Sequence, residues 1–423
     1  MNYEIKKVAV LGTGVMGSQI AAHLSNANIE VYAFDINQEV AKNGIEASTK
    51  LKPSPYYNLK TTSLITSMNY DEHLEKLKEC DWIIEAISER LDWKQDLYKK
   101  IEPYISENTI VTSNTSGISL SDLSTGMSDK FLSTFFITHF FNPPRYMRLV
   151  EIINSNKTNP EMVSYMSVFM EEVLGKGVVI AKDTPNFIAN RIGVYGMMVT
   201  LEEAKTKKIS IEDVDALTGT LIGRPKSATF RTADVVGLDT MAFVANTAYE
   251  KCSEDNDRAV FKLPDYIQTM LDNKWLGQKS KQGFYKKIDK GVIHSLNLET
   301  LEYTPMKKNK YDAFALAKER THLKDRLNVI VRSDDIAGEF LWNCFSRTLC
   351  YAASLLGEIA DDVVSVDNAM KWGFGWDLGP FEVLDAIGLD YFVGRLEKEN
   401  KIIPSFLKKI QESDLSSVYS IID

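Results

Sequence analysis

Short apolar runs and helical patterns alternate along the first 180 residues. The apolar runs predict strands at 8–11, 31–34, 64–68, 82–86 and 109–112. A helical pattern follows the first run, and a second helix is expected over 72–79. Strands that alternate with helices favour a mostly parallel, doubly wound sheet. In such a sheet the binding site lies at the carboxyl ends of the strands.

Two later runs carry titratable residues at their ends. The run 135–138 leads into His139, and a returning strand over 147–151 ends at Glu151. The segment 142–144, Asn-Pro-Pro, supplies a turn between them. A last strand is expected over 175–180. The spacing therefore allows a hairpin-like return, and leaves open whether the imidazole and the carboxylate touch.

From residue 187 onward the pattern becomes helical and contains an internal repeat. ADVVGLD at 233–239 and LDAIGLD at 384–390 lie 151 residues apart, and Asp215 and Asp367 lie at nearly the same offset. Similar sequences at a fixed offset indicate a duplicated helical domain. The polar segment 286–310 is expected to be the linker between the copies. We predict three domains, at 1–184, 185–300 and 301–423.

Composition narrows the class of protein. A chain of 423 residues with a net charge of −9 is expected to have several cores and no nucleic-acid-binding surface. The four cysteines show no CxxC spacing, which is typical of a reducing compartment, and no metal is expected. The N-terminus has no signal-peptide pattern, and no apolar run approaches membrane-spanning length. We therefore expect a cytoplasmic protein that does not bind a membrane.

A glycine-rich segment, GTGVMG at 12–17, lies between the first predicted strand and the first helix. The first glycine permits a tight turn, the second allows close approach of a pyrophosphate, and the third allows close packing of helix and strand. Asp35 ends the next strand, where a carboxylate accepts the ribose 2′-OH and repels a 2′-phosphate. This order predicts a Rossmann-type domain that binds NAD rather than NADP. The residues expected to contact the cofactor are Gly12, Thr13, Gly14, Val15, Met16, Gly17 and Asp35.

Polar residues at strand ends are the candidates for chemistry. Glu89 follows the strand at 82–86, Ser116 follows the strand at 109–112, and His139 ends the next one. Imidazole exchanges protons near neutral pH, which suits the proton transfer in an alcohol oxidation, and Glu151 could orient it. A structural histidine is the equally weighted alternative on these residues alone.

Five motifs, in order, resemble the L-3-hydroxyacyl-CoA dehydrogenase family of fatty-acid β-oxidation. They are GTGVMG, CDWIIEAISE, SNTSGISL, THFFNPPRYMRLVE and KDTPNFIANR, and the likeness extends over residues 5–290. The chain is most similar to the dehydrogenase part of bacterial bifunctional β-oxidation enzymes. The resemblance implies a Rossmann-type doubly wound sheet followed by two tandem helical domains of this family's C-terminal type. It also implies NAD-dependent oxidation of (S)-3-hydroxyacyl-CoA to 3-oxoacyl-CoA.

The resemblance also implies roles for individual residues. His139 and Glu151 match the catalytic pair, and Ser116 and Asn190 match residues at the substrate oxygen. Asn142 matches a further substrate-binding position. Matches to cofactor-contacting positions are Glu89, Lys94, Ser116 and Lys279. The lysines at 50, 52 and 60 lie near the family's CoA-binding segment, although a solvated surface is the more ordinary interpretation.

Two positions depart from the family pattern, which has glycine at both. Asn186 is expected to have little effect, because asparagine is the next best residue for a positive φ. For Lys281 the sequence gives no expectation. The second helical copy has no FIANR equivalent, only Phe340 to Asn343, so a packing role is expected for it.

The family implies partners as well. Members with one helical domain use it as a dimer interface, so a two-copy chain is expected to be a monomer or a homodimer. A fused or associated enoyl-CoA hydratase is a further expectation, and the substrate is an acyl-CoA thioester. The alternatives are a dehydrogenase of a free hydroxy acid on the same fold and a non-catalytic scaffold subunit.

Overall fold

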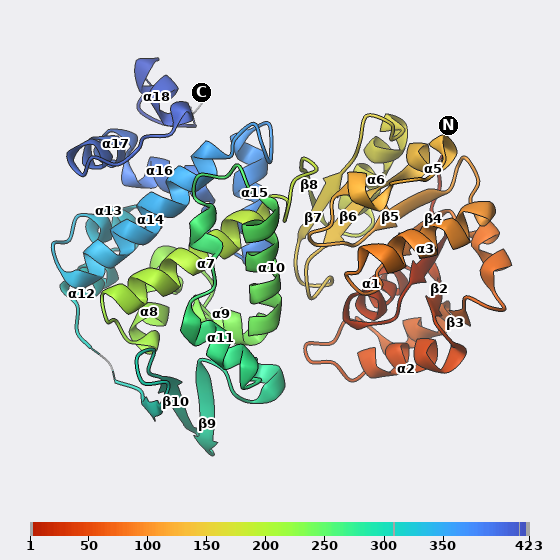
Figure 1. The fold of residues 1–423 in the computed structure, drawn as a ribbon, viewed down its shortest axis with the longest axis horizontal. Coiled ribbons are helices and arrows are strands. Elements are labelled where there is room, and N and C mark those ends of the chain that lie inside the picture. Colours follow the sequence, from red (N-terminus) through yellow and green to blue (C-terminus); the bar gives the residue numbers. More distant parts are fainter. Residues whose placement is uncertain (1–2, 308, 414, 420–423) are drawn as a thin grey trace. The chain divides into compact units, whose positions relative to one another are not determined.

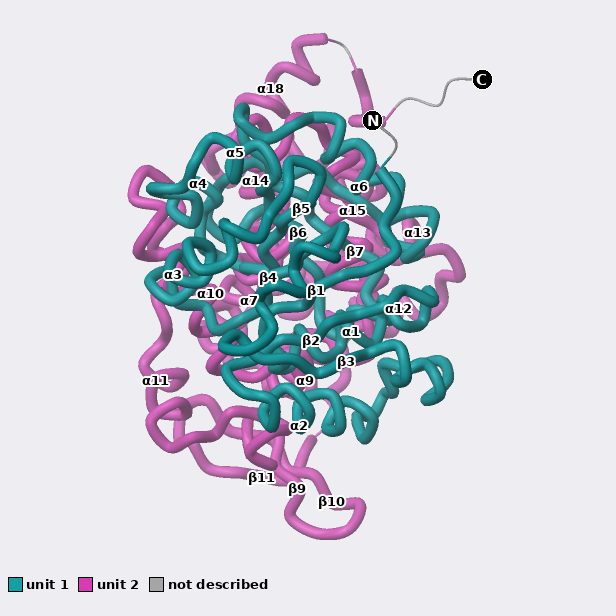
Figure 2. The backbone as a smooth tube through the Cα atoms, turned by 90° about the vertical axis from the view of Figure 1, so that its right-hand side faces the viewer, with its two compact units in different colours: residues 1–187 teal, residues 188–423 magenta. Residues whose placement is uncertain are grey.

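The computed structural model describes residues 3–307, 309–413 and 415–419. The chain divides into two compact units, residues 1–187 and 188–423, which Figure 2 colours teal and magenta. The first unit is built around a large sheet, and the second is mainly helical. Among the described residues, no helix is both long enough and apolar enough to cross a membrane.

An eight-stranded sheet forms the centre of the first unit (Figure 1). Its strand order is β3-β2-β1-β4-β5-β6-β7-β8. All neighbours pair in parallel except β6 and β7, so β7 and β8 run opposite to the other six strands. The strands are β1 Lys7–Leu11, β2 Glu30–Asp35, β3 Ile65–Asn69, β4 Trp82–Glu85, β5 Ile110–Ser113, β6 Phe135–Phe140, β7 Leu149–Ile153 and β8 Gly177–Ile180. The predicted mostly parallel, doubly wound sheet is confirmed.

Helices cover both faces of this sheet. The α-helices are α1 Val15–Asn26, α2 Gln38–Ser48, α3 Leu91–Ile101, α4 Leu120–Leu123, α5 Asp129–Thr134 and α6 Pro160–Glu172, and the 3₁₀ helices are η1 Leu59–Leu64, η2 Leu74–Glu79 and η3 Glu102–Tyr104. Residues of α1 and α6 share a core with Phe136 of β6. Its neighbour Phe135 points to the opposite face and packs against Tyr98 of α3 and Phe131 of α5. The helix expected at 72–79 is the 3₁₀ helix η2.

The second unit is mainly helical. Its α-helices are α7 Ala189–Thr206, α8 Ile211–Thr218, α9 Phe230–Val236, α10 Leu238–Lys251, α11 Asp265–Asp272, α12 Asp312–Lys318, α13 Leu323–Val331, α14 Ile336–Ser354, α15 Val363–Phe374, α16 Pro380–Ile387, α17 Leu389–Lys398 and α18 Ser405–Glu412. The 3₁₀ helices are η4 Thr220–Ile222, η5 Arg258–Phe261 and η6 Gln278–Ser280. Helix α7 packs against α14 and α15. A Cβ on Gly193 of α7 would lie 2.1 Å from the ring of Phe374, so α15 approaches closely there.

The sequence repeat is also a repeat of hydrogen bonds. Asp215 of α8 accepts backbone N–H groups at the start of α9 and the hydroxyl of Tyr285. Asp367 of α15 accepts backbone N–H groups at the start of α16 and the hydroxyl of Tyr419. Burial raises the pKa of Asp215 to about 6 and that of Asp367 to about 7, although these hydrogen bonds act in the opposite direction. Each carboxylate therefore ties one helix to the start of the next in both copies.

A second carboxylate closes each copy. Asp234 accepts the backbone N–H groups of Phe284 and Tyr285, and Asp385 accepts those of Val418 and Tyr419. The two aspartates are 151 residues apart, the same offset as the sequence repeat. In each copy, two aspartates thus bind the same tyrosine, Tyr285 in the first copy and Tyr419 in the second. This shared arrangement supports the interpretation of a duplication.

The segment 286–310 is not a simple linker, so that prediction was wrong for most of it. Strands β9 Tyr285–Asp289, β10 Val292–Leu296 and β11 Tyr303–Pro305 form an antiparallel sheet in the order β11-β10-β9. Gly291, with a φ of +81°, lies in the turn between β9 and β10. Many side chains of β9 are exposed, which is why the composition of this sheet resembled that of a loop.

Candidate active site

The glycine segment turns the chain from β1 into α1 at the carboxyl edge of the sheet. Gly12 has a φ of +100°, and a Cβ there would lie 2.8 Å from the carbonyl oxygen of Ala86. A Cβ on Gly17 would lie 1.8 Å from the carbonyl oxygen of Gly12, so helix and loop touch at this point. A Cβ on Gly14 would meet nothing within 4 Å. The space above Gly14 is the approach that a pyrophosphate needs.

The start of α1 fits an anionic group. The helix begins at Val15 with no capping side chain and no acidic residue in its first turn. Its first N–H groups therefore have no competing anion, and the helix dipole favours negative charge there. Asp35, the last residue of β2, accepts hydrogen bonds from the N–H and the hydroxyl of Thr13 at 2.7 and 2.6 Å. Asp35 therefore holds the glycine segment in place. It also lies where the ribose of the cofactor is expected.

His139 and Glu151 face each other across the antiparallel pair β6 and β7. The two residues are register partners, and His139 Nδ1 lies 2.7 Å from Glu151 Oε2. Both side chains are buried, at 4% and 0% exposed. With Nδ1–H donating to the carboxylate, Nε2 is left as an acceptor. The hydroxyl of Ser116 donates to it at 3.1 Å.

Apolar and polar neighbours hold the imidazole in place. The rings of Phe141 and Phe187 lie 4.5 and 5.6 Å from the His139 ring, centroid to centroid. Asn114, just after β5, accepts the backbone N–H of Phe140 at 2.9 Å. Asn186 has a φ of +65°, so the residue that replaces the family's glycine adopts the left-handed conformation that glycine would favour.

Glu89 organises the loop that carries Ser116. One oxygen of its carboxylate accepts the Thr115 hydroxyl at 2.5 Å and the N–H groups of Ser116 and Gly117 at 2.8 and 3.1 Å. Burial opposes ionisation of Glu89, but Lys94 and these hydrogen bonds outweigh it and hold the pKa of Glu89 below its usual value. Glu89 is thus ionised and bound to the Ser116 loop at neutral pH. Lys94 is 1% exposed and lies 3.4 Å from Glu89.

Two buried side chains, Gln19 and Lys176, hold the turn that follows β6. Gln19 of α1 donates to Asn142 Oδ1 at 3.1 Å. The ammonium group of Lys176 donates to the carbonyl oxygens of Pro144 and Met147. Burial lowers the pKa of Lys176 to about 8. The Gln19 contact joins the turn bearing Asn142 to the helix that starts at the glycine segment, and the Lys176 contacts join it to the residue before β8.

Sequence reasoning assigned no role in this region to Gln19, Glu85, Asn114 and Lys176. Asn114 and Glu85 lay inside quoted motifs, and their positions at strand ends were the available signal. Gln19 and Lys176 gave no signal, because a glutamine on a helix and a lysine near a strand are ordinary surface residues in sequence. Only the fold shows that both side chains are buried.

Two predicted site residues belong to the second unit, and the three predicted CoA lysines lie on the surface of the first. Asn190 is in the first turn of α7, in the second unit. Lys279 is in η6 of the second unit and pairs with Asp239 at 2.5 Å. Lys281, the second departure from the family pattern, has a φ of +61°. The lysines at 50, 52 and 60 are all exposed.

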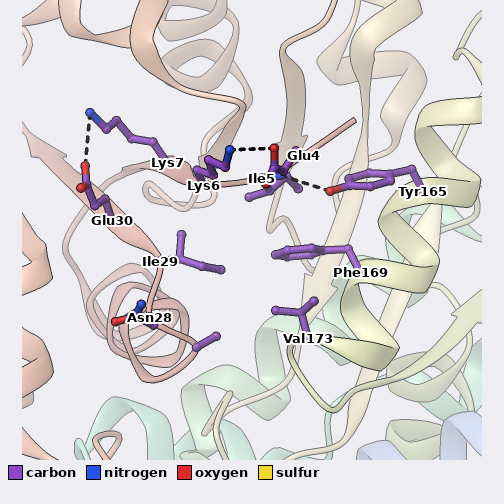
Figure 3. Close-up of a pocket in the computed structure, with 11 residues that line it drawn as sticks. Glu4, Ile5, Lys6, Lys7, Asn28, Ile29, Glu30, Tyr165, Phe169 and Val173 are labelled. Atoms are coloured by element: carbon purple, nitrogen blue, oxygen red, sulfur yellow. Dashed lines mark hydrogen bonds and ion pairs between the residues drawn. The ribbon is translucent and has the colours of Figure 1, made fainter. Parts of the chain in front are cut away.

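A separate hollow of about 620 Å³ in the first unit is not part of this site (Figure 3). It lies beside Lys7 and Glu30, which begin β1 and β2, at the end of the sheet opposite to His139. Its charged residues pair with one another, Lys7 with Glu30 at 3.2 Å and Lys6 with Glu4 at 2.7 Å. None of the described residues that line it has a side chain suited to proton transfer near neutral pH.

Family models match both units. The model described as 3-hydroxyacyl-CoA dehydrogenase, NAD binding domain, matches residues 7–184, and that of the C-terminal domain matches 187–287 and 341–412. The chain belongs to the 3-hydroxyacyl-CoA dehydrogenase family. Its first unit is therefore an NAD-binding domain, which confirms the predicted cofactor. The two C-terminal matches fall on the two copies of the helical repeat.

Named relatives agree with this membership. A Bacillus subtilis protein described as a probable 3-hydroxyacyl-CoA dehydrogenase is 47% identical over 99% of this chain and 56% of its own length. The human protein named hydroxyacyl-coenzyme A dehydrogenase, mitochondrial, is 31% identical over 67% of this chain and 91% of its own. A Rickettsia prowazekii protein described as a candidate fatty acid oxidation complex trifunctional enzyme is 31% identical over 98% of this chain and 58% of its own length. The chain thus spans little more than half of two of these relatives.

Solved structures show the same fold. The crystal structure of 3-hydroxybutyryl-CoA dehydrogenase from Escherichia coli matches 97% of this chain and 99% of its own, with a TM-score of 0.71 and 18% identity. That of (S)-3-hydroxybutyryl-CoA dehydrogenase from Ralstonia eutropha covers 66% of this chain with a TM-score of 0.55 and 26% identity.

Proposed function

We propose that the chain oxidises (S)-3-hydroxyacyl-CoA thioesters to 3-oxoacyl-CoA, with NAD as the acceptor, in fatty-acid β-oxidation. The observation that carries this proposal is the buried His139–Glu151 pair, with Nε2 directed at the Ser116 hydroxyl. The family membership supports the same reaction.

His139 Nε2 takes the proton from the 3-hydroxyl of the substrate. Glu151 keeps the proton on Nδ1, so that Nε2 is the basic atom, and stabilises the positive charge that develops on the ring. Ser116 and Asn190 hydrogen-bond the oxygen that becomes a carbonyl, and Asn142 is a further substrate-binding residue of the same site. The burial of the pair excludes water, which strengthens the interaction between the two charges.

The residues that would hold NAD are those of the glycine segment together with Asp35, Glu89, Lys94, Ser116 and Lys279. When bound, NAD accepts the hydride from C3 of the substrate. The open approach at Gly14 and the uncapped start of α1 fit its pyrophosphate. The carboxylate of Asp35 fits a ribose 2′-OH and disfavours the 2′-phosphate of NADP.

His139→Gln tests the proposal, with acetoacetyl-CoA as substrate and the oxidation of NADH followed by absorbance. We expect kcat to fall about 10²–10⁴-fold while the Kd for NADH, from its fluorescence, stays within about twofold. His322→Gln, at an exposed histidine before α13, is the matched control and should retain full activity. An unchanged kcat in His139→Gln would end the assignment.

The same assay separates the alternatives. A dehydrogenase of free hydroxy acids would reduce acetoacetate as well as acetoacetyl-CoA, and a scaffold subunit would reduce neither. We expect reduction of the thioester alone, because the CoA part contributes binding energy that the free acid lacks.

Further proposals concern the assembly. We propose that 185–300 and 301–423 are two helical domains, of which the second has a packing role, in a monomer or homodimer. The name of the Rickettsia relative supports an associated or fused enoyl-CoA hydratase. Four free cysteines, three of them buried, support a reducing compartment such as the cytoplasm. Sedimentation at several concentrations tests the oligomeric state.

A further inference from the structure

Glu85 is a buried carboxylate that the proposed chemistry does not use. It ends β4, and its side chain is 0% exposed. One of its oxygens accepts Lys94 Nζ at 2.6 Å and the Ile87 N–H at 2.8 Å. The other accepts the Tyr98 hydroxyl at 2.7 Å and the Ser113 hydroxyl at 2.6 Å. Two donors on each oxygen fix the orientation of the carboxylate.

The first oxygen leads to the Ser116 loop through two charged side chains. Lys94 Nζ lies 2.6 Å from Glu85 and 3.4 Å from Glu89. Glu89 in turn holds the loop through the Thr115 hydroxyl and the N–H groups of Ser116 and Gly117. Glu85 and Lys94 thus determine the position of the Glu89 carboxylate, which binds the loop.

The second oxygen reaches the same loop by a shorter path. The Ser113 hydroxyl donates to Glu85, and the Ser113 oxygen accepts the N–H of Thr115 at 3.2 Å. Thr115 is therefore restrained through both oxygens of a single carboxylate. The next residue, Ser116, donates to His139 Nε2.

We propose that Glu85 is a positioning residue for Ser116. This inference rests on the proposed function, because it gives Ser116 a role in the reaction. Glu85 touches neither His139 nor the space above Gly14, and acts through the loop 115–117. Its effect on the reaction is expressed through the position of the Ser116 hydroxyl.

Removing the charge of Glu85 would disturb the path through Lys94 in either orientation of the new amide, and the path through Ser113 in one of them. Glutamine has one accepting oxygen and one donating NH₂, so the NH₂ would face either Lys94 or the Ser113 and Tyr98 hydroxyls. Lys94 would also lose its nearer carboxylate, and a buried ammonium with one distant partner would move toward Glu89. Each change shifts the residues that hold Ser116, and hydrogen-bond geometry in an active site tolerates little displacement.

The test is a double-mutant cycle in the full chain, with acetoacetyl-CoA and saturating NADH. We expect Glu85→Gln to lower kcat about 10–100-fold in the wild-type background and less than about twofold in a Ser116→Ala background. A merely structural role would give the same loss in both backgrounds, and that result would overturn the inference. Equal kcat for Glu85→Gln and the wild type would overturn it as well.

Two further variants protect the test against loss of stability. Tyr98→Phe removes one hydrogen bond from the same carboxylate but leaves both paths to the loop, so kcat should stay within about twofold even where Tm falls. Ser113→Ala breaks only the shorter path, and we expect a loss of about 3–10-fold in kcat that again disappears with Ser116→Ala. If Glu85→Gln does not fold, Ser113→Ala decides alone, and an undiminished loss beside Ser116→Ala would refute the inference.

The two proposals fail in different ways. An unchanged kcat in His139→Gln removes the proposed function, and the inference with it. A large loss of kcat in His139→Gln, together with independent effects of Glu85→Gln and Ser116→Ala on kcat, would refute the inference and leave the proposed function standing.

Discussion

His139 Nδ1 and Glu151 Oε2 lie 2.7 Å apart as register partners on β6 and β7, the one antiparallel pair in the eight-stranded sheet. The reversal of β7 is what brings residue 151 back beside residue 139. Because side chains alternate between faces along a strand, both point away from the core shared by α1 and α6. Pairing two buried polar groups in this way satisfies both of them.

Glu151→Gln is expected to lower kcat about 10²-fold or more. Glutamine can still contact Nδ1, but it carries no charge to stabilise the imidazolium and can donate as well as accept, so the tautomer is no longer fixed. Steady-state reduction of acetoacetyl-CoA measures kcat, and fluorescence of bound NADH measures cofactor affinity. Glu161→Gln, in the first turn of α6, is a control that leaves the pair intact. Retention of more than half of the wild-type kcat in Glu151→Gln would contradict a catalytic role.

Gly14→Ala and Gly17→Ala should have opposite effects. A methyl group at 14 has room in the fold, so Tm should stay within about 2 °C while NAD binding weakens about tenfold or more, because the pyrophosphate loses its close approach. A methyl group at 17 would clash with Gly12 and should lower Tm markedly. Thermal melts with and without NAD measure both effects. Wild-type NAD affinity in Gly14→Ala would place the pyrophosphate elsewhere.

Asp35→Ala should reduce the preference for NAD over NADP. The substitution removes the carboxylate expected at the ribose, ends the repulsion of a 2′-phosphate and releases the two hydrogen bonds from Thr13. We expect kcat/KM for NAD to fall about 10–100-fold and the NAD to NADP ratio to move toward one. Asp96→Ala, at a side chain 80% exposed on α3, removes the same charge and should keep the ratio. An unchanged ratio in Asp35→Ala would show that another residue selects the cofactor.

Asp367 should make stability depend on pH. Burial raises its folded-state pKa to about 7, against about 3.8 for the unfolded chain. Its contribution is therefore fully present below about pH 4 and is lost as the pH rises through 7, because the unfolded state releases the proton first. Asp367→Asn cannot gain this contribution, so its deficit in unfolding free energy should shrink by about 2–4 kcal/mol between pH 4 and 7.

Urea unfolding of the wild type and Asp367→Asn at several pH values measures that difference. Asp390→Asn, at an exposed residue of the same repeat, is the control, and its difference from the wild type should not vary. A constant difference for Asp367→Asn would mean that Asp367 is ionised throughout.

The first 180 residues were the most predictable part of the fold. The strands there are apolar runs that each pack against helices, so the pattern reports the local structure directly. The sheet at 285–305 was missed because its strands are short and largely exposed, and exposed strands lack the apolar signal. The repeated sequence indicated the duplication. The roles of Asp215 and Asp367 came only from the structure, in which each carboxylate accepts backbone N–H groups at the start of the following helix.

The sequence alone determined the order of strands, glycines and helices, the NAD-binding domain and the family, because these depend on residues close together in the chain. Tertiary structure decided which distant residues meet. It brought Glu151 to His139, Glu89 to the Ser116 loop and Gln19 to Asn142, and it buried Glu85, Lys94 and Lys176. Such contacts depend on strand direction and register, which no short stretch of sequence specifies, and on burial, which arises only when separate elements pack together.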